Sequence, residues 1–335
     1  MKNIIQASLI TTFRCNARCQ MCEIWRYPTK PSEELDPKYY EKLPPGLRVN
    51  ITGGEPTLRE DIEDIFKILY QKSYLLELNT NGYYTDRIVK IAEKFPNILI
   101  RVSVEGLPAL NDKLRGLPNG FDHALRTILE LKKTKCKNIG FSIVISPKNV
   151  SDLIHLYRLC CYLGIELGNS ALHNSWYFHK YDNVIVGDRE EWRGVAEFIE
   201  QMLMSSRRGI KNKLKDYSRA YFNLSILKRL RGDPPGYRPP CGAGSDFFFI
   251  DPWGNVTPCN GSNEEWIMGN IKDNSLDNIM NSENAKECII KVKNCNENCC
   301  FVVTERHDMV RKPWKPIYWV MKNKIKLVLN LSMEF

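Results

Sequence analysis

Residues 4–22 read IIQASLITTFRCNARCQMC, an apolar run that leads directly into three closely spaced cysteines. The run is typical of a first strand rather than of a signal peptide, because Gln6, Ser8, Thr11 and Thr12 interrupt it with polar side chains. Cysteines that follow a strand so closely fall on a loop, and in a parallel barrel the loops after the strands form the functional face. This stretch therefore predicts a β/α architecture and the position of its site.

The chain continues to about residue 170 with short apolar runs that alternate with longer amphipathic segments. Such alternation is typical of repeated βα units and predicts a parallel sheet. The expected strands are Ile4–Ile10, Arg48–Thr52, Leu75–Asn79, Ile98–Val104, Gly140–Ile145 and Ile165–Gly168, and the expected helices are Pro37–Lys42, Asp61–Gln71, Asp86–Lys94, Phe121–Lys133 and Val150–Leu163. Because these units are too few for the usual eight-unit barrel, we predict an α/β fold with a partial (β/α)6 TIM-like barrel.

The composition narrows the class of protein. Of 335 residues, 43% are apolar and 26% are charged, which is ordinary for a globular protein and excludes wholesale disorder. No apolar run approaches the roughly 18 residues that a membrane-spanning helix needs. With no secretion signal we expect a cytoplasmic protein, in which 12 cysteines indicate metal ligation rather than disulfides.

The cysteines fall into two groups and a remainder. The first thiol group is Cys15, Cys19 and Cys22, and the last hundred residues contain Cys241, Cys259, Cys288, Cys295, Cys299 and Cys300. Cys136, Cys160 and Cys161 stand in apolar surroundings and Cys288 in a helical stretch, so we expect these four to pack in the core. The clustering predicts two metal centres.

The net charge of +9 is concentrated in two segments. Residues 205–231 carry nine Lys and Arg against one Asp, and residues 306–326 carry seven against one Asp. A basic segment attracts nucleic acid, anionic lipid or an acidic protein, but it is equally often a solvated helix face. Charge alone leaves both interpretations open.

The first thiol group favours an iron–sulfur cluster over zinc. Structural zinc normally uses four ligands, and no fourth Cys or His lies near these three in the sequence. Three thiolates on a cluster of four irons would instead leave one iron open for another ligand.

Four further motifs follow the cysteine loop in order. They are Thr52-Gly53-Gly54-Glu55-Pro56, Asn79-Thr80-Asn81-Gly82, Ser103-Val104-Glu105-Gly106 and Asn111-Asp112-x2-Arg115-Gly116. Together with the cysteines they resemble the radical S-adenosylmethionine (SAM) superfamily, over residues 7 to about 170. The two glycines of the first motif let the backbone approach a ligand, and Glu55 is able to accept a bond from an ammonium group.

The resemblance implies a cofactor site and an activity. Cys15, Cys19 and Cys22 would hold a [4Fe–4S] cluster whose open iron binds SAM, and a flavodoxin- or ferredoxin-type donor would supply one electron. Reductive cleavage would then yield a 5′-deoxyadenosyl radical that abstracts hydrogen from a substrate. The resemblance assigns Gly53, Gly54, Glu55 and Pro56 to the methionine end of SAM, and Asn79, Asn81, Ser103 and Glu105 to the ribose. Glu105 departs from the family's usual Asp.

The later cysteines resemble the SPASM or twitch extension of the same superfamily. Phe247–Phe249 and Val256–Cys259 are expected to form a hairpin, and a second [4Fe–4S] cluster is assigned to Cys241, Cys259, Cys295 and Cys299, the second thiol group. Cys299 and Cys300 are adjacent and do not readily ligate one site together, and structural zinc on the same thiolates is the alternative. Such a cluster either accepts the electron left on a substrate radical or orders the extension.

We divide the chain into a core barrel (1–185), a helical connector (186–235), an auxiliary-cluster domain (236–305) and a basic aromatic tail (306–335). The connector is expected to contain helices at Arg189–Ser205 and Lys213–Leu230, and the Pro- and Gly-rich stretch Gly232–Pro240 marks its end.

The leading hypothesis is a radical SAM oxidoreductase that oxidises a small metabolite, a sugar or a lipid-linked glycan. The alternative is a maturase that modifies a ribosomally made peptide, disfavoured here because no peptide-recognition module precedes the barrel. An iron–sulfur electron carrier or a nucleic-acid-binding module is the non-enzymatic alternative. The SAM motif argues against both, so no nucleic-acid partner is expected. The catalytic residues are unknown; His173 and Tyr177 are candidates because they follow the sixth strand.

The tail predicts a helix from about Ile317, since Pro313 and Pro316 are tolerated only in a first turn. Its apolar face would carry Tyr318, Met321, Ile325 and Val328, flanked by Lys322 and Lys326. Two outcomes are open: weak association with an anionic membrane surface, which would make the protein peripheral to the membrane, or packing of this face against the barrel.

Overall fold

The computed structural model describes residues 6–205, 207, 209–233, 241–261, 265–297, 299, 303, 305, 309 and 311–335. The start of the first expected strand, most of the boundary expected at 232–240, and Cys300 lie outside these residues.

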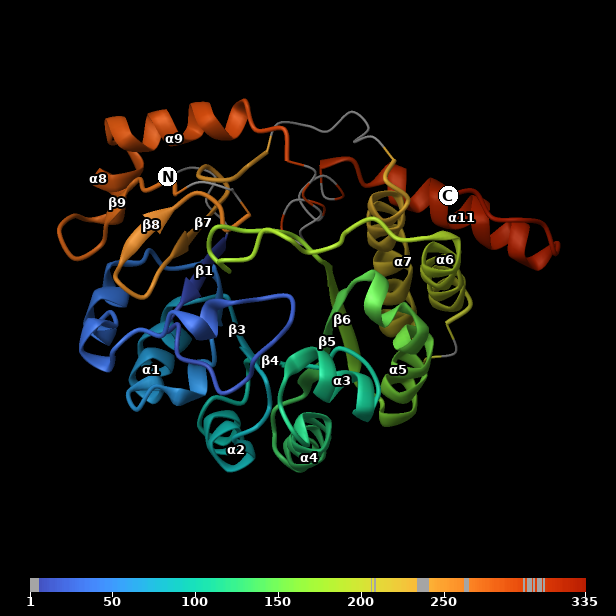
Figure 1. Ribbon diagram of the computed structural model, residues 1–335, viewed down its shortest axis with the longest axis horizontal. Coiled ribbons are helices and arrows are strands. Elements are labelled where there is room, and N and C mark those ends of the chain that lie inside the picture. Colours follow the sequence, from blue (N-terminus) through green and yellow to red (C-terminus); the bar gives the residue numbers. More distant parts are fainter. Residues whose placement is uncertain are drawn as a thin grey trace.

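Six parallel strands form the centre of the molecule, as the sequence predicts (Figure 1). They are β1 (Gln6–Ile10), β2 (Arg48–Thr52), β3 (Leu75–Thr80), β4 (Leu99–Ser103), β5 (Asn138–Ile145) and β6 (Glu166–Ala171). Each pairs with the next along the chain, so the strand order follows the sequence and every motif that follows a strand reaches the same edge of the sheet.

Period-two alternation divides the side chains of these strands between two faces. Leu9, Ile51, Leu78 and Ile100 lie opposite one another in register, and all four are fully buried in the main hydrophobic core. This apolar layer is what holds the sheet against its helices, while polar residues alternate with it toward the concave side.

The helices lie outside the curved sheet (Figure 1). They are α1 (Ile62–Lys72), α2 (Thr85–Lys94), α3 (Pro108–Arg115), α4 (Gly120–Lys133) and α5 (Val150–Leu163), and short 3-10 helices occur at Ile24–Arg26, Pro31–Glu33, Pro37–Lys42, Pro56–Leu58 and Pro147–Asn149. The sequence analysis missed α3. Its signals are Pro108 at the first position and Gly116, which ends it in the left-handed conformation at φ 53°.

Two longer helices cover the sheet beyond β6: α6 (Arg189–Leu203) and α7 (Ile210–Leu230). Part of the basic segment 205–231 is used internally here. Lys215 and Arg219 pair with Glu166 at the start of β6, and Arg207 pairs with Asp216, which is fully buried. Lys215 and Arg219 therefore join α7 to the sheet, and Arg207 joins the segment before α7 to that helix.

The expected hairpin forms, but it does not stand apart from the barrel. Its strands β7 (Phe247–Ile250) and β8 (Asn255–Thr257) are antiparallel, and a short β9 (Gly269–Asn270) follows. β7 pairs in parallel with β1, with Gln6 opposite Phe247, so the hairpin continues the barrel sheet to nine strands. The pairing covers an edge that β1 would otherwise expose. Helices α8 (Leu276–Met280) and α9 (Glu283–Lys293) pack beyond it.

The tail forms helix α11 (Trp314–Val328), which begins three residues earlier than expected because Pro316 fits within the first turn. Trp319 packs against Tyr221 of α7, with ring centroids 5.6 Å apart. The predicted apolar face does not pack: Tyr318, Met321, Ile325 and Val328 are all exposed. No helix among the described residues has the length and apolar character to cross a membrane.

Candidate functional site

The first thiol group lies on the loop after β1, and its three thiols are close enough to influence one another. Burial, together with the neighbouring Cys19, raises the pKa of Cys15 and of Cys22 to about 12. Burial also raises the pKa of Cys19, while Arg115 lowers it. Buried thiolates crowded together need a cationic partner, which suits ligation of a metal cluster.

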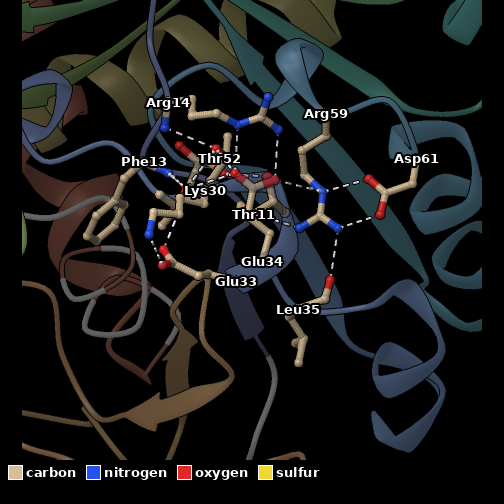
Figure 2. A network of polar contacts seen from close by, with 12 residues as sticks. Thr11, Phe13, Arg14, Lys30, Glu33, Glu34, Leu35, Thr52, Arg59 and Asp61 are labelled. Carbon is tan, nitrogen blue, oxygen red and sulfur yellow. Dashed lines mark hydrogen bonds and ion pairs between the residues drawn. The ribbon is translucent and has the colours of Figure 1, made fainter.

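A buried polar network holds the base of this loop (Figure 2). The Glu34 side chain is 3% exposed and receives hydrogen bonds from Arg14 Nε and Nη2 at 2.9 and 2.8 Å. Thr12 and Thr29 also donate to Glu34, and Thr29 Oγ1 accepts from the Phe13 amide at 3.1 Å. The backbone that leads into Cys15 is therefore fixed by a carboxylate from a segment twenty residues later in the chain.

Arg59 is the second centre of the network, and its residue is only 2% exposed. Its guanidinium donates to the carbonyl oxygens of Thr11 and Leu35, both at 2.8 Å, and to both carboxylate oxygens of Asp61 (Figure 2). It thus connects the end of β1 to the segment after the 3-10 helix Pro31–Glu33 and to the start of α1. Sequence reasoning did not single out Glu34 or Arg59.

The turn Gly53–Gly54 packs directly on the cysteine loop. Gly54 N donates to Thr12 O at 2.7 Å, and Glu55 N donates to Arg14 O at 2.8 Å. A Cβ on Gly53, which has φ +150°, would lie 2.5 Å from Thr12 O, and one on Gly54 would lie 2.3 Å from Arg14 O. The glycines are therefore required by the approach of two backbones, a constraint that acts before any ligand binds.

Glu55 is fully buried and already has several protein partners. Its carboxylate accepts from Thr57 N and Oγ1, from Thr80 Oγ1 at 2.8 Å and from Asn81 N at 2.7 Å. Burial raises its pKa, although these hydrogen bonds oppose the shift. Glu55 joins the turn after β2, where Pro56 starts a short helix, to the end of β3.

The positions assigned to the ribose follow β3 and β4. Asn81 Nδ2 donates to Asn16 Oδ1 at 2.6 Å, which links the end of β3 to the cysteine loop, and Asn79 pairs with Asn50 on the neighbouring strand. Ser103 is half-buried at the end of β4. These residues lie at the same edge as the first thiol group, because their strands are parallel neighbours.

Glu105 and Arg115 form a buried pair beside the thiols. Arg115 Nη1 lies 3.1 Å from Glu105 Oε1, and Val144 N donates to the other oxygen at 2.9 Å. Burial raises the pKa of Glu105 to about 7, against the lowering effect of Arg115. Arg115 Nε is buried and makes no hydrogen bond within the described residues, so a cationic donor is available at this site. The sequence analysis noted Arg115 in a motif but assigned it no role.

The second thiol group is assembled from two distant parts of the chain. Burial raises the pKa of Cys259 most, and Cys299, Cys241 and Cys295 each raise it further, which places the four thiols together. Gly261 N donates to Cys259 Sγ at 3.0 Å. Cys241 and Cys295 are exposed, in contrast to the first thiol group.

The remaining described cysteines stay out of both groups. Cys136, Cys160 and Cys288 are buried in the main core, and Cys161 packs partly buried against it, as the sequence predicts.

Among the residues that the structure describes, no three His, Cys, Asp or Glu side chains converge on a point that one metal ion would occupy. A four-iron cluster binds each thiolate to a different iron, so it does not require its ligands to meet at one point.

A cavity of about 210 Å³ lies between the barrel and the second thiol group. Its walls are His173, Asn174, Tyr181, Ile185, Arg229, Gly261, Glu297 and Cys299. Burial, with a smaller effect of Arg229, lowers the pKa of His173 to about 4, so the imidazole is neutral at pH 7. Tyr177 does not line this cavity: it is 2% exposed, its hydroxyl lies 3.5 Å from Thr257 Oγ1, and burial raises its pKa well above 10.

Comparison with known families identifies two domains in the chain. The radical SAM superfamily matches residues 9–160, and the iron–sulfur cluster-binding SPASM domain matches residues 241–301. The first range contains the first thiol group and every motif assigned to SAM, and the second contains the second thiol group.

Several curated relatives match at low identity. The Methanosarcina barkeri Fe-coproporphyrin III synthase is 29% identical over 44% of this chain and 39% of its own length. The Bacillus subtilis sporulation killing factor maturation protein SkfB is 22% identical over 87% and 68%, and the Mycolicibacterium smegmatis mycofactocin maturase MftC is 25% identical over 80% and 68%. The chain thus spans between 39% and 68% of the length of these relatives.

Solved structures share the fold. Native anSMEcpe with bound AdoMet and a Cp18Cys peptide has a TM-score of 0.63 at 17% identity, covering 95% of this chain and 99% of that one. Streptococcus suis SuiB bound to the precursor peptide SuiA has a TM-score of 0.62 at 18% identity, covering 85% and 66%. Both likenesses cover more of the chain than the barrel alone.

Proposed function

This chain is a radical SAM protein with a SPASM iron–sulfur domain, and from that premise we propose that it is a maturase that modifies a peptide. The two domains imply a [4Fe–4S] cluster with SAM and an auxiliary iron–sulfur centre. When bound, the first cluster and SAM supply reductive cleavage of the sulfonium and abstraction of a substrate hydrogen. The protein itself supplies binding, orientation and the exclusion of water.

Cys15, Cys19 and Cys22 would hold the first cluster, and the Glu34–Arg59 network holds their loop in place. Arg115 offers a buried cationic donor beside them, suited to the carboxylate of SAM. The resemblance assigns the turn Gly53–Gly54, with Glu55 and Pro56, to the methionine end of SAM, and Asn79, Asn81, Ser103 and Glu105 lie at neighbouring strand ends for the ribose. Cys241, Cys259, Cys295 and Cys299 would hold the auxiliary cluster.

The observation that carries the peptide assignment is the extent of the matches. The relatives that align over both domains, at 80–87% of this chain, are named as maturation proteins. The Fe-coproporphyrin III synthase aligns over only 44%. This supports the peptide alternative better than the small-metabolite hypothesis that the sequence analysis preferred.

The cavity is the proposed place for the reacting group. At about 210 Å³ it is smaller than the roughly 300–1,000 Å³ of most ligand pockets, so it suits one side chain of a longer substrate. His173 would contact that side chain as a neutral imidazole, and Arg229 would provide a positive charge beside it. The polar and charged residues in its wall are compatible with a second candidate, oxidation of a small polar metabolite.

The finer proposal is an oxidoreductase, in which the substrate would lose one hydrogen atom to the cleaved SAM, one electron to the auxiliary iron–sulfur centre and one proton to solvent, a net loss of two electrons. A flavodoxin- or ferredoxin-type protein is the proposed electron donor. Tyr177 is an unsuitable proton carrier because it is buried away from the cavity with a strongly raised pKa.

Deuterium transfer tests the substrate class directly. Reconstituted protein, SAM and dithionite are incubated with either the peptide fraction or the small-metabolite fraction of deuterium-grown source cells. Deuterium in 5′-deoxyadenosine from the peptide fraction is expected. If only the small-metabolite fraction transferred deuterium, the second candidate would be supported in place of the maturase. If no 5′-deoxyadenosine formed under any condition, the proposal that this chain is an enzyme would be refuted.

A further inference from the structure

Helix α11 presents an apolar face to solvent along its whole length. Trp314, Ile317, Tyr318, Met321, Ile325 and Val328 are each between 58 and 73% exposed. They recur at three- and four-residue intervals, which places them on one side of an α-helix. We call these six residues the outer face of α11. A continuous exposed apolar stripe of this kind marks an interaction surface.

The opposite side of α11 is firmly attached to the body of the protein. Besides the contact between Trp319 and Tyr221, Lys324 Nζ donates to Tyr217 OH at 2.6 Å and to Leu203 O at 3.3 Å. Asn323 is fully buried and its Oδ1 accepts from Glu334 N at 2.7 Å. The outer face is therefore held outward by defined contacts, at the end of the molecule away from α8 and α9 (Figure 1).

The charged residues around the outer face indicate what kind of surface it binds. Residues 311–335 contain six Lys and Arg and a single acidic residue, Glu334, and α11 itself contains no acidic side chain. Glu334 bridges Lys322 and Lys326, which leaves the surface strongly positive. Lys315 is exposed next to the aromatic residues Trp314 and Tyr318. Such charge is complementary to an anionic surface, and it opposes pairing with a second copy of the same helix.

We propose that the outer face of α11 lies flat on an anionic lipid surface, with its apolar side chains at the boundary between headgroups and acyl chains. Tryptophan and tyrosine are favoured at that boundary, and flanking lysines bind anionic headgroups. The 15 residues of α11 are about 22 Å long at 1.5 Å per residue, shorter than the roughly 30 Å hydrocarbon core, so the helix binds the surface without crossing it. The surface is independent of the proposed reaction.

Sedimentation of the full chain with vesicles tests this proposal. The probes are vesicles of phosphatidylcholine with one quarter phosphatidylglycerol, and vesicles of phosphatidylcholine alone. We expect pelleting with the anionic vesicles, little with the neutral ones, and release at 0.5 M salt, where charge interactions are screened. The triple variant Ile317→Ser, Met321→Ser, Ile325→Ser should bind at least about tenfold more weakly.

The control is a triple variant with equally exposed apolar residues elsewhere: Tyr162→Ser, Leu214→Ser and Ile290→Ser. It should bind as the unaltered chain does, and both variants should keep its thermal midpoint, because every changed side chain is exposed. Equal pelleting of the two variants would overturn the proposal, as would absence of binding to anionic vesicles. A dimer that only the α11 variant dissociates would show that the occupant is a second copy, and would also overturn it.

Discussion

The two thiol groups are built in opposite ways. The first lies on one loop, within eight residues of sequence, and a buried network centred on Glu34 and Arg59 holds that loop. The second is drawn from positions 241 to 299, and two of its four thiols are exposed. Cysteine spacing alone points to the first group, whereas the second was assigned through its resemblance to the SPASM or twitch extension, because its cysteines are spread over positions 241 to 299. Local spacing thus suffices for a site whose ligands share a loop, and the fold has to bring together ligands that do not.

The largest expected effect separates the two groups by function. Changing Cys15, Cys19 and Cys22 together to Ala should reduce 5′-deoxyadenosine to background, because no ligands for the first cluster remain. Iron should fall from about eight to about four atoms per chain, the content of one cluster. Product is measured by chromatography and iron by elemental analysis. Cys161→Ala, outside both groups, should change neither, and retained cleavage in the triple variant would contradict the assignment.

The reverse change should remove the other half of the iron. With Cys241→Ala and Cys259→Ala we expect SAM cleavage within about threefold of the unaltered chain but loss of complete substrate turnover. Cys288→Ala serves as control, because this buried thiol of α9 is not in the second thiol group. Zinc rather than iron in the anaerobically purified protein, or equal loss of iron from both groups, would remove the distinction between the sites.

The network under the first thiol group provides a smaller, selective effect. Arg59→Leu leaves the carbonyl oxygens of Thr11 and Leu35 without their donor, and each buried acceptor left unsatisfied costs about 1–3 kcal/mol. We expect a chelator to remove iron from the first group faster, with the second group unchanged. Arg126→Leu, at an exposed pair with Asp86, should alter the free energy of unfolding by less than about 1 kcal/mol. Equal acceleration at both groups would mean that Arg59 stabilises the whole fold and not the loop.

A change of Glu166, at the start of β6, should lower the stability of the fold without affecting either thiol group. Burial alone would raise the pKa of Glu166, but Arg219, Arg101 and Lys215 outweigh it and lower the pKa from 4.5 to about 2. The unfolded chain therefore binds the extra proton, and this contribution to stability is present above pH 4.5 and is lost as the pH falls toward 2.

Glu166→Gln should accordingly cost about 3 kcal/mol at pH 7 and flatten this part of the pH profile, with the ratio of iron in the two groups unchanged. Denaturant unfolding at several pH values measures it. Glu130→Gln, at an exposed pair with Lys133, is the matched control. If the free energy of unfolding of the Glu166 variant fell with decreasing pH as it does in the unaltered chain, another group would be responsible for that fall.

Local patterns accounted for most of the secondary structure. The strands and helices of the barrel were predicted with small shifts at their ends, because periods of two and of about 3.6 are properties of the sequence itself. The predicted fold class rests on the βα alternation and the two cofactor types on the resemblance to radical SAM enzymes, and the matches confirm both. α3 was missed although Pro108 and Gly116 mark its ends.

Other features were beyond local patterns. The cysteine spacing and the Gly53–Gly54 motif identified the site, but Glu34 and Arg59 carry no signal of their own, since a Glu or Arg in a loop is ordinarily solvated. In the folded chain both side chains are buried and hydrogen-bonded to the segment that leads into the cysteine loop, so they position that loop. Likewise the sequence offered His173 and Tyr177 equally, and only the packing placed His173 on the cavity wall and Tyr177 behind it.

The sequence by itself determined the βα alternation, the first thiol group, the SAM motifs and the amphipathic tail helix, because each depends on residues close together along the chain. Tertiary structure alone decided that β7 joins the barrel sheet, that the basic residues of α7 pair with Glu166, and that the outer face of α11 stays exposed. These outcomes depend on which distant surfaces meet. Which surfaces meet depends on how much apolar area the whole folded chain buries and on whether its buried polar groups find hydrogen-bond partners. No short stretch of sequence contains that information.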